Sequence, residues 1–255
     1  MGRSTNQFLL HEEMPAKIKW VQHGDDLYVD PLLMQSCGTR VYRYATLAEA
    51  FGLISRGEWT FAKPTEWTDK YEKYIAEELF DAGRPFGNLV GFVKCVSFEY
   101  SSEAMWRTYS SAGGLVRLSW TFGDLLTMLQ EACWPSKHKV YVAPVRYLSA
   151  PMLRAQIDTF KNAKPSSQHA KRALLMKRNG FAFENEIRIS YFSAIEDDSK
   201  FITAKEVPCT LIDRVLVDPY LGSWQAKEIC RIFKDVLKVS ADVAHSKFDT
   251  VSIPM

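Results

Sequence analysis

The hydrophobic pattern of this chain changes its period many times. Segments with an apolar residue at every second position, as in strands, are interspersed with segments of helical period, and the two do not alternate regularly. Neither an internal repeat nor a low-complexity linker interrupts the 255 residues. This irregular order is typical of an α+β fold. The sequence therefore predicts an irregular N-terminal arm over residues 1–38 and a single α+β domain of catalytic type over residues 39–255.

Local signals place the first elements of that domain. The β-branched and aromatic run at 39–45 predicts a strand, and Thr46 with Glu49 forms a capping box that opens a helix ending at Gly57. The further expected helices are 69–83, a short one after 101, 122–133, an interrupted stretch at 150–178, and 223–237. The further expected strands are 58–63, 89–100, 115–121, 139–148, 181–192, 200–207, 209–217 and 241–248.

The composition and the missing motifs exclude several function classes. The chain has 32 Lys and Arg against 30 Asp and Glu. With charges so nearly balanced, we do not expect a polyanion to bind over the whole surface, but this balance does not exclude a local basic patch. Its five cysteines are scattered without a C-x-x-C pair, so we expect free thiols and no metal site. Walker, dinucleotide-glycine, zinc-hydrolase and serine-hydrolase motifs are absent. No segment resembles a signal peptide or a membrane span, so a cytoplasmic protein is expected.

The most informative stretch is residues 181–192. If it is one strand, Glu184, Glu186 and Arg188 share one face, and Phe183 and the other apolar residues share the opposite face. The two carboxylates would then lie about 6–7 Å apart along the strand. A fixed carboxylate can stabilise the oxocarbenium-like state of glycosidic cleavage. The alternative is a solvated face with weak Glu–Arg pairs, which the periodicity alone favours.

Basic residues are concentrated just before this stretch. Between Glu131 and Glu184 the only acidic residue is Asp158. The basic residues in the same interval are Lys137, Lys139, Arg146, Arg154, Lys161, Lys164, Lys171, Arg172, Lys177 and Arg178. This composition suits a phosphate-bearing ligand or nucleic acid, and a solvated helix face explains it equally well.

Arg43 stands between two tyrosines in the first expected strand. Strand alternation puts Arg43 on the face opposite Tyr42 and Tyr44. Its planar guanidinium could hold a phosphate or a ribose. A salt bridge is the commoner role for such an arginine.

Several motifs, in order along the chain, resemble a bacterial family known only as a domain of unknown function. They are Tyr42-Arg43-Tyr44, residues 59–62, Trp67 to Asp69 with Glu72, residues 95–98, Met105-Trp106 with Tyr109, Gly114-Leu115, and Lys177 with residues 183–189. The resemblance covers residues 41–190. This chain departs from the family at Thr68-Asp69-Lys70, where Asn-Asp-Pro is usual.

That family is in turn similar to ADP-ribosyltransferases. The similarity implies a split β-sheet core with flanking helices, which holds NAD as a substrate without a glycine fingerprint. It implies that Glu186 binds the nicotinamide ribose and stabilises the oxocarbenium state, while Glu184 orients or deprotonates the acceptor. It assigns Arg43 to the adenosine ribose or pyrophosphate and a ring such as Tyr71 to nicotinamide. The further residues that it implies for NAD binding are Tyr44, Ser97 and Arg188.

The function expected from this resemblance is glycosyl transfer of ADP-ribose from NAD to a macromolecule, either nucleic acid or protein. Related proteins act as toxins or in defence against phage, so an antitoxin or immunity protein is an expected partner. Two alternatives stay open: a metal-dependent nuclease with Glu184 and Glu186 as ligands, and a non-catalytic binding module. Met105 and Trp106 are expected in the core, and Ser97 either lines the site or is structural.

Overall fold

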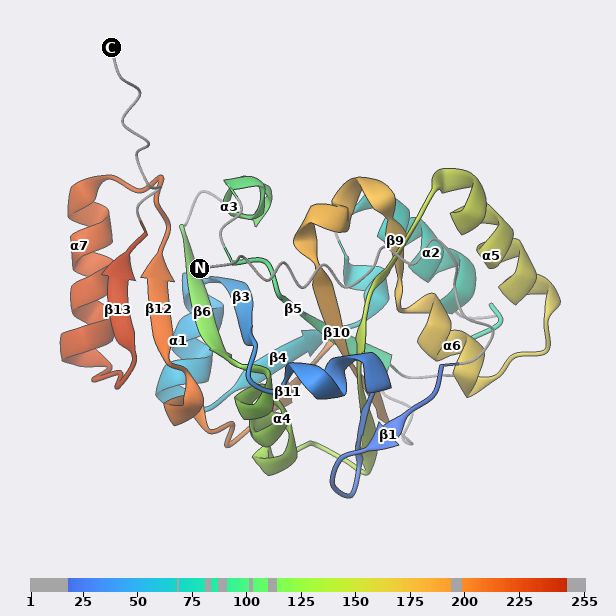
Figure 1. Ribbon diagram of the computed structural model, residues 1–255, viewed down its shortest axis with the longest axis horizontal. Coiled ribbons are helices and arrows are strands. Elements are labelled where there is room, and N and C mark those ends of the chain that lie inside the picture. The colour runs from blue at the N-terminus through green and yellow to red at the C-terminus, as the bar shows by residue number, and fades with distance from the viewer. Residues whose placement is uncertain are drawn as a thin grey trace, which may run out of the picture. The chain divides into compact units, whose positions relative to one another are not determined.

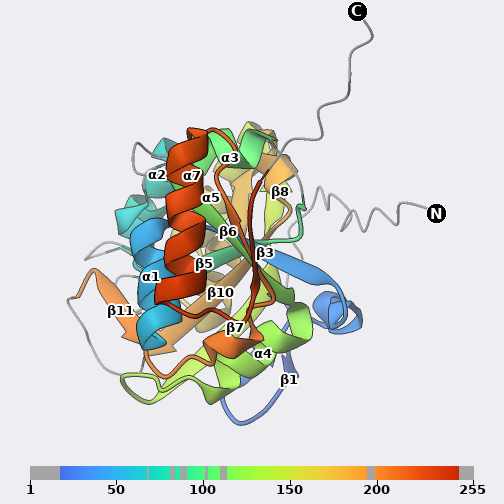
Figure 2. The same cartoon turned by 90° about the vertical axis from the view of Figure 1, so that its left-hand side faces the viewer.

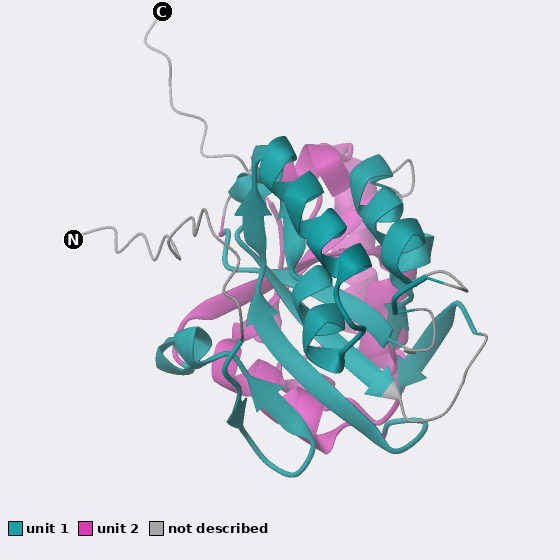
Figure 3. Ribbon diagram, turned by 90° about the vertical axis from the view of Figure 1, so that its right-hand side faces the viewer, with its two compact units in different colours: residues 1–37, 60–99, 134–204 teal, residues 38–59, 100–133, 205–255 magenta. Residues whose placement is uncertain are grey.

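The computed structural model describes a mixed arrangement of strands and helices, which confirms the predicted α+β class (Figure 1). The described residues are 18–67, 69–80, 84–86, 91–100, 103–109, 114–193 and 199–246. The chain divides into two compact units, each assembled from three segments (Figure 3). Unit 1 comprises residues 1–37, 60–99 and 134–204, and unit 2 comprises residues 38–59, 100–133 and 205–255.

Strand β10 (Glu186–Ser193) is central in the sheet of unit 1. It pairs antiparallel with β5 (Gly91–Ser97) on one side and with β7 (His138–Pro144) on the other. The strands beyond β7 are β2 (Leu27–Val29), which is parallel to β7, and β1 (Val21–Gln22). The strands beyond β5 are β4 (Trp59–Ala62) and β11 (Phe201–Ala204). Residues 21–29, within the segment expected as an arm, thus supply two strands of this sheet.

A second, small sheet in unit 1 joins β8 (Arg146–Leu148) and β9 (Met176–Arg178) in parallel. The expected strand at 139–148 is divided at Val145 into β7 and β8. Strand β9 lies where the sequence predicts the end of an interrupted helix. A strand of three residues is too short to show an alternating apolar pattern.

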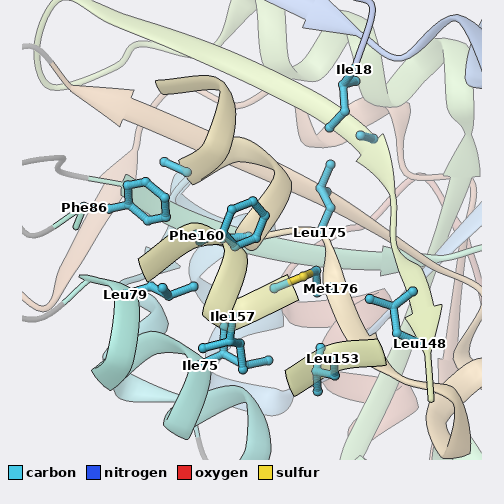
Figure 4. Close-up of a cluster of buried hydrophobic side chains, with 13 residues drawn as sticks. Ile18, Ile75, Leu79, Phe86, Leu148, Leu153, Ile157, Phe160, Leu175 and Met176 are labelled. Carbon is cyan, nitrogen blue, oxygen red and sulfur yellow. The ribbon is translucent and has the colours of Figure 1, made fainter. Parts of the chain in front are cut away.

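Three helices form an apolar cluster in unit 1. They are α2 (Lys70–Phe80), α5 (Ala150–Asn162) and α6 (Ser167–Ala173). Leu153, Ile157 and Phe160 repeat at helical spacing along α5 and meet Ile75 and Leu79 of α2 (Figure 4). This cluster fixes α2 and the strand β9, both of which carry charged residues of the candidate site.

Unit 2 contains four adjacent strands. Its strands, in spatial order, are β3 (Arg40–Thr46), β6 (Leu115–Thr121), β12 (Arg214–Val217) and β13 (Asp242–His245). The first two pairings are antiparallel and the last is parallel. Strand β6 has the bounds that the sequence predicts, because Gly114 and the cap at Thr121 delimit it locally.

Helices lie on the sheet of unit 2. Helix α1 (Leu47–Arg56) begins at the Thr46 cap and ends at Gly57, as the sequence predicts. Gly57 has a left-handed φ of 63°. Helix α7 (Ser223–Arg231) continues as a π-helix through Val236 and lies beside α1, and the rings of Phe51 and Phe233 are 5.2 Å apart (Figure 2). Helix α4 (Phe122–Glu131) starts from its own capping box. Helix α3 (Glu103–Tyr109) buries Met105 and Trp106, which confirms their expected place in the core.

Candidate active site

A short turn in unit 1 brings Lys177, Glu184 and Glu186 together. Lys177 lies on β9, and the chain then turns through a 3₁₀ helix (Asn179–Glu184) and Asn185, whose φ of 42° is left-handed, into the first residue of β10. The Lys177 ammonium lies 2.5 Å from Glu184 Oε2 and 2.9 Å from Glu186 Oε2. One cation therefore joins both carboxylates that the sequence singled out.

Three sequence-based expectations for this stretch are wrong. Only residues from Glu186 onward form the strand, so Glu184 reaches the site from a turn and not from the next position along a strand face. The solvated-face alternative fails as well, since Glu184, Glu186 and Arg188 are at most 4% exposed. Phe183, expected in the core, is 37% exposed because the turn changes its direction.

Arg188 links Glu186 to helix α2. Its Nε lies 2.8 Å from Glu186 Oε1, and its second terminal nitrogen forms an ion pair with Glu72. The remaining terminal nitrogen donates to the Leu174 carbonyl, and the Trp67 ring centroid is 4.6 Å from the guanidinium carbon. Glu72 Oε2 is also 3.5 Å from the Lys177 ammonium. The sequence marks Glu72 as part of a helix start and of the family motifs, but it gives no sign of the pairing with Arg188, which is 116 residues away.

The buried network contains three carboxylates and two cations. Burial opposes ionisation of Glu186, but Arg188 and Lys177 outweigh it and hold the pKa of Glu186 well below its usual value. At Glu184, burial and the charge of Glu186 outweigh Lys177 and raise the pKa to about 7. A single proton on Glu184 would make the network electrically neutral. The two carboxylates thus differ sharply in proton affinity.

Neutral groups complete the surroundings of Glu186. Its backbone N–H donates to the Tyr147 hydroxyl at 2.8 Å, and burial raises the pKa of that phenol. Cys95, opposite Arg188 on β5, has a thiol pKa raised by burial and by the charge of Glu186. Both groups remain protonated and leave the negative charge on Glu186. The sequence gives no signal for Tyr147, which comes from a different strand.

Ser97 and Tyr71 border the network in different ways. The Ser97 hydroxyl donates to the Glu184 carbonyl and accepts the Glu99 N–H, so it holds the turn that carries Glu184. Tyr71, on α2, is 46% exposed, and the Arg178 guanidinium carbon lies 3.7 Å from its ring centroid. One face of the ring expected to stack on nicotinamide therefore already carries a cation.

Arg43 and Tyr44 belong to unit 2, whereas the other predicted site residues belong to unit 1. Arg43 makes two hydrogen bonds, of 3.1 and 3.0 Å, to the carboxylate of Glu49. Arg43 thus forms the salt bridge that is the commoner role of such an arginine. The Glu49 carboxylate that it binds is the group expected to complete the capping box at Thr46. Tyr44 is buried with its ring edge-on to Trp106, on the opposite face of β3.

The basic interval before Glu184 does not form a single exposed surface. Arg146, Arg172 and Lys177 are buried, and Arg146 pairs with Asp30. The exposed members are Lys137, Lys139, Arg154, Lys161 and Lys164. The nucleic-acid interface that the sequence suggests is thus reduced to these side chains and to the half-buried Lys171 and Arg178.

Two further observations concern metal ions and membranes. Within the described ranges, no group of three or more His, Cys, Asp or Glu residues is arranged to hold a metal ion. Between Glu184 and Glu186, the place that a metal would take in the nuclease alternative is held by the Lys177 ammonium.

Among the described helices, none is both long and apolar enough to cross a membrane.

Comparison with known proteins supports the resemblance to a family of unknown function. Residues 105–189 match the model of a family described as "Protein of unknown function (DUF2971)", which confirms the predicted similarity over that segment. No curated protein matches the chain. The structure of Thermus sp. 2.9 DarT in complex with ADP-ribosylated ssDNA aligns with 82% of this chain and 95% of that chain, at 12% identity and a TM-score of 0.38. At this level of similarity, catalytic assignments depend on the geometry of this chain.

Proposed function

We propose that the chain transfers ADP-ribose from NAD to a macromolecular acceptor at the Glu184–Glu186 site. The observation that carries the proposal is the pair of buried carboxylates whose pKa values are shifted in opposite directions. Paired titratable groups with separated pKa values are typical of acid–base catalysis. The resemblance of the surrounding motifs to ADP-ribosyltransferases selects glycosyl transfer among such reactions.

In this proposal Glu186 is the fixed negative charge. Arg188 and Lys177 keep its carboxylate ionised and oriented, so it can accept a hydrogen bond from a ribose hydroxyl and oppose positive charge at the anomeric carbon. NAD, when bound, supplies the ADP-ribosyl group and releases nicotinamide. Glu184, with a pKa of about 7, takes the proton of the acceptor.

The rings around the network suit a nicotinamide-bearing substrate. Trp67 lies on Arg188, and Phe181 lies 5.1 Å from the Lys177 ammonium. Both rings are partly exposed and contact the cations that hold the buried carboxylates. We propose that these rings and Tyr71 line the part of the NAD site that holds nicotinamide, and that Ser97 and Arg188 hold the carboxylates in position. Arg43 remains a prediction for the adenosine ribose or pyrophosphate, and Tyr44 remains a prediction for NAD binding.

The acceptor is proposed from the surface charge of unit 1 and the biological role from the resemblance. The exposed basic residues between Lys137 and Arg178 suit a nucleic acid, and single-stranded DNA is the first acceptor to test. A toxin or phage-defence role, with an antitoxin or immunity partner, is proposed from the resemblance alone. A non-catalytic module is the second candidate, because every carboxylate of the network is already paired and buried.

The test measures nicotinamide release and label transfer from labelled NAD in the presence of a chelator, with single-stranded DNA, RNA or cell lysate added. Glu186→Gln, which removes the charge and nearly preserves the shape, should abolish both signals. Glu77→Gln is the matched control, since Glu77 is an exposed carboxylate on α2 outside the network. Transfer that the wild type and the control perform and Glu186→Gln does not would support the proposal. Absence of turnover and of NAD binding in the wild type would refute it.

A further inference from the structure

Arg117 is a buried cation that lacks a carboxylate partner within the described ranges. It lies on β6 and is 3% exposed. Its guanidinium carbon is 4.7 Å from the Tyr42 ring centroid and 4.9 Å from that of Tyr100. Among the described residues no side-chain hydrogen bond or ion pair reaches the guanidinium, and its Nε is buried without an acceptor. A buried charge is costly unless it is paired, and two rings offset only part of that cost.

The other arginines near this sheet face are neutralised. Arg40 shares the face with Arg117 through the pairing of β3 with β6, and it lies 2.7 Å from Asp213. Arg214 shares it through β12 and lies 3.0 Å from Asp242. Arg117 is therefore the arginine of this sheet face whose charge no carboxylate contacts among the described residues. An anion from outside the described chain would balance it.

Two tyrosines at Arg117 supply further recognition groups. Burial outweighs the nearby arginines and raises the pKa of Tyr42, so its phenol stays protonated and can donate. Within the described part of the chain, no hydrogen bond engages the Tyr42 hydroxyl. The Tyr100 side chain is 56% exposed, so a planar group from solvent can reach its ring. The Arg117 guanidinium, the Tyr42 hydroxyl and the exposed Tyr100 ring thus lie together in unit 2.

We propose that Arg117, Tyr42 and Tyr100 form a binding site for a nucleoside phosphate. The guanidinium fork and the Tyr42 hydroxyl bind phosphate oxygens, because arginine matches phosphate geometry with two parallel hydrogen bonds. The base stacks on the exposed Tyr100 ring, as bases do on aromatic side chains. The proposal does not depend on the carboxylates of the proposed transferase site, which belong to unit 1, and it uses neither Arg43 nor Tyr44.

The test is calorimetric titration of the full chain with three probes: pyrophosphate, adenosine and AMP. AMP should bind more tightly than either probe that carries only one half of the ligand. Arg117→Gln should weaken pyrophosphate and AMP by about tenfold or more, whereas Tyr100→Ala should weaken AMP and adenosine and spare pyrophosphate. Tyr220→Ala is the matched control, because Tyr220 is also an exposed ring beside an arginine, but Glu103 already neutralises its Arg107.

A second readout keeps the proposal open to refutation if Arg117→Gln folds poorly. Pyrophosphate should raise the Tm of the wild type and of Tyr220→Ala, and Tyr42→Phe should reduce that increase. Failure of the wild type to bind AMP and pyrophosphate at millimolar concentration would overturn the proposal, as would unchanged binding by Arg117→Gln. Neither result depends on NAD turnover, so the outcome is separate from that of the transferase test.

Discussion

Replacing Glu184 with glutamine should remove a specific pH dependence of stability. The folded state holds the Glu184 proton up to a pH of about 7, whereas the ordinary pKa of a glutamate is 4.5. Between these values the folded chain keeps a proton that the unfolded chain has lost, so the free energy of unfolding falls as pH rises. The gap corresponds to about 3 kcal/mol, and most of it, about 2 to 3 kcal/mol, falls between about pH 5 and 8.

The measurement is urea unfolding of wild type and Glu184→Gln at several pH values, followed by the fluorescence of the seven tryptophans. The amide that replaces the carboxyl group cannot ionise, so the stability of the variant relative to the wild type should rise by about 2 to 3 kcal/mol from about pH 5 to pH 8. Glu77→Gln controls for the loss of one exposed carboxylate and should show no such trend. A difference that stays constant across this range would refute the reasoning, because Glu184 would then titrate like an ordinary glutamate.

Three further substitutions test other parts of the structure. Glu186→Gln removes one of the two anions that Arg188 and Lys177 share, the other being Glu72, and should cost about 3 to 5 kcal/mol at pH 7. The loss should shrink below pH 4.5, where the low pKa of Glu186 stops favouring the folded wild type, and urea titrations at both pH values check this. Arg43→Gln should cost about 1 kcal/mol or less, and a much larger loss of NAD affinity than of stability would support its predicted role. Gly57→Ala should lower stability by about 1 to 2 kcal/mol in the same assay, because φ is 63° and the added Cβ meets Val207 at 3.2 Å.

Elements with strong local signals could be predicted from the sequence. The helix between Thr46 and Gly57 has its cap and its left-handed end encoded within a dozen residues, and both occur in the structure. Strand β6 is likewise bounded by a glycine and a cap. The alternation along β10 also predicted that Glu186 and Arg188 share a face, which their 2.8 Å contact confirms. Nearest-neighbour geometry suffices for these features.

The tertiary structure decided which segments cover the face of β10 that carries Glu186 and Arg188. Strand periodicity states which side chains lie together, but it does not distinguish a solvated face from one that other segments bury. Glu72 of α2 and Lys177 of β9 reach the face only because the apolar cluster fixes their elements there. The turn at Asn185, not the strand period, brings Glu184 to Lys177. Burial raises the pKa of Glu184, whereas Arg188 and Lys177 outweigh burial at Glu186 and lower its pKa, and both effects arise only once the folded chain buries these groups together.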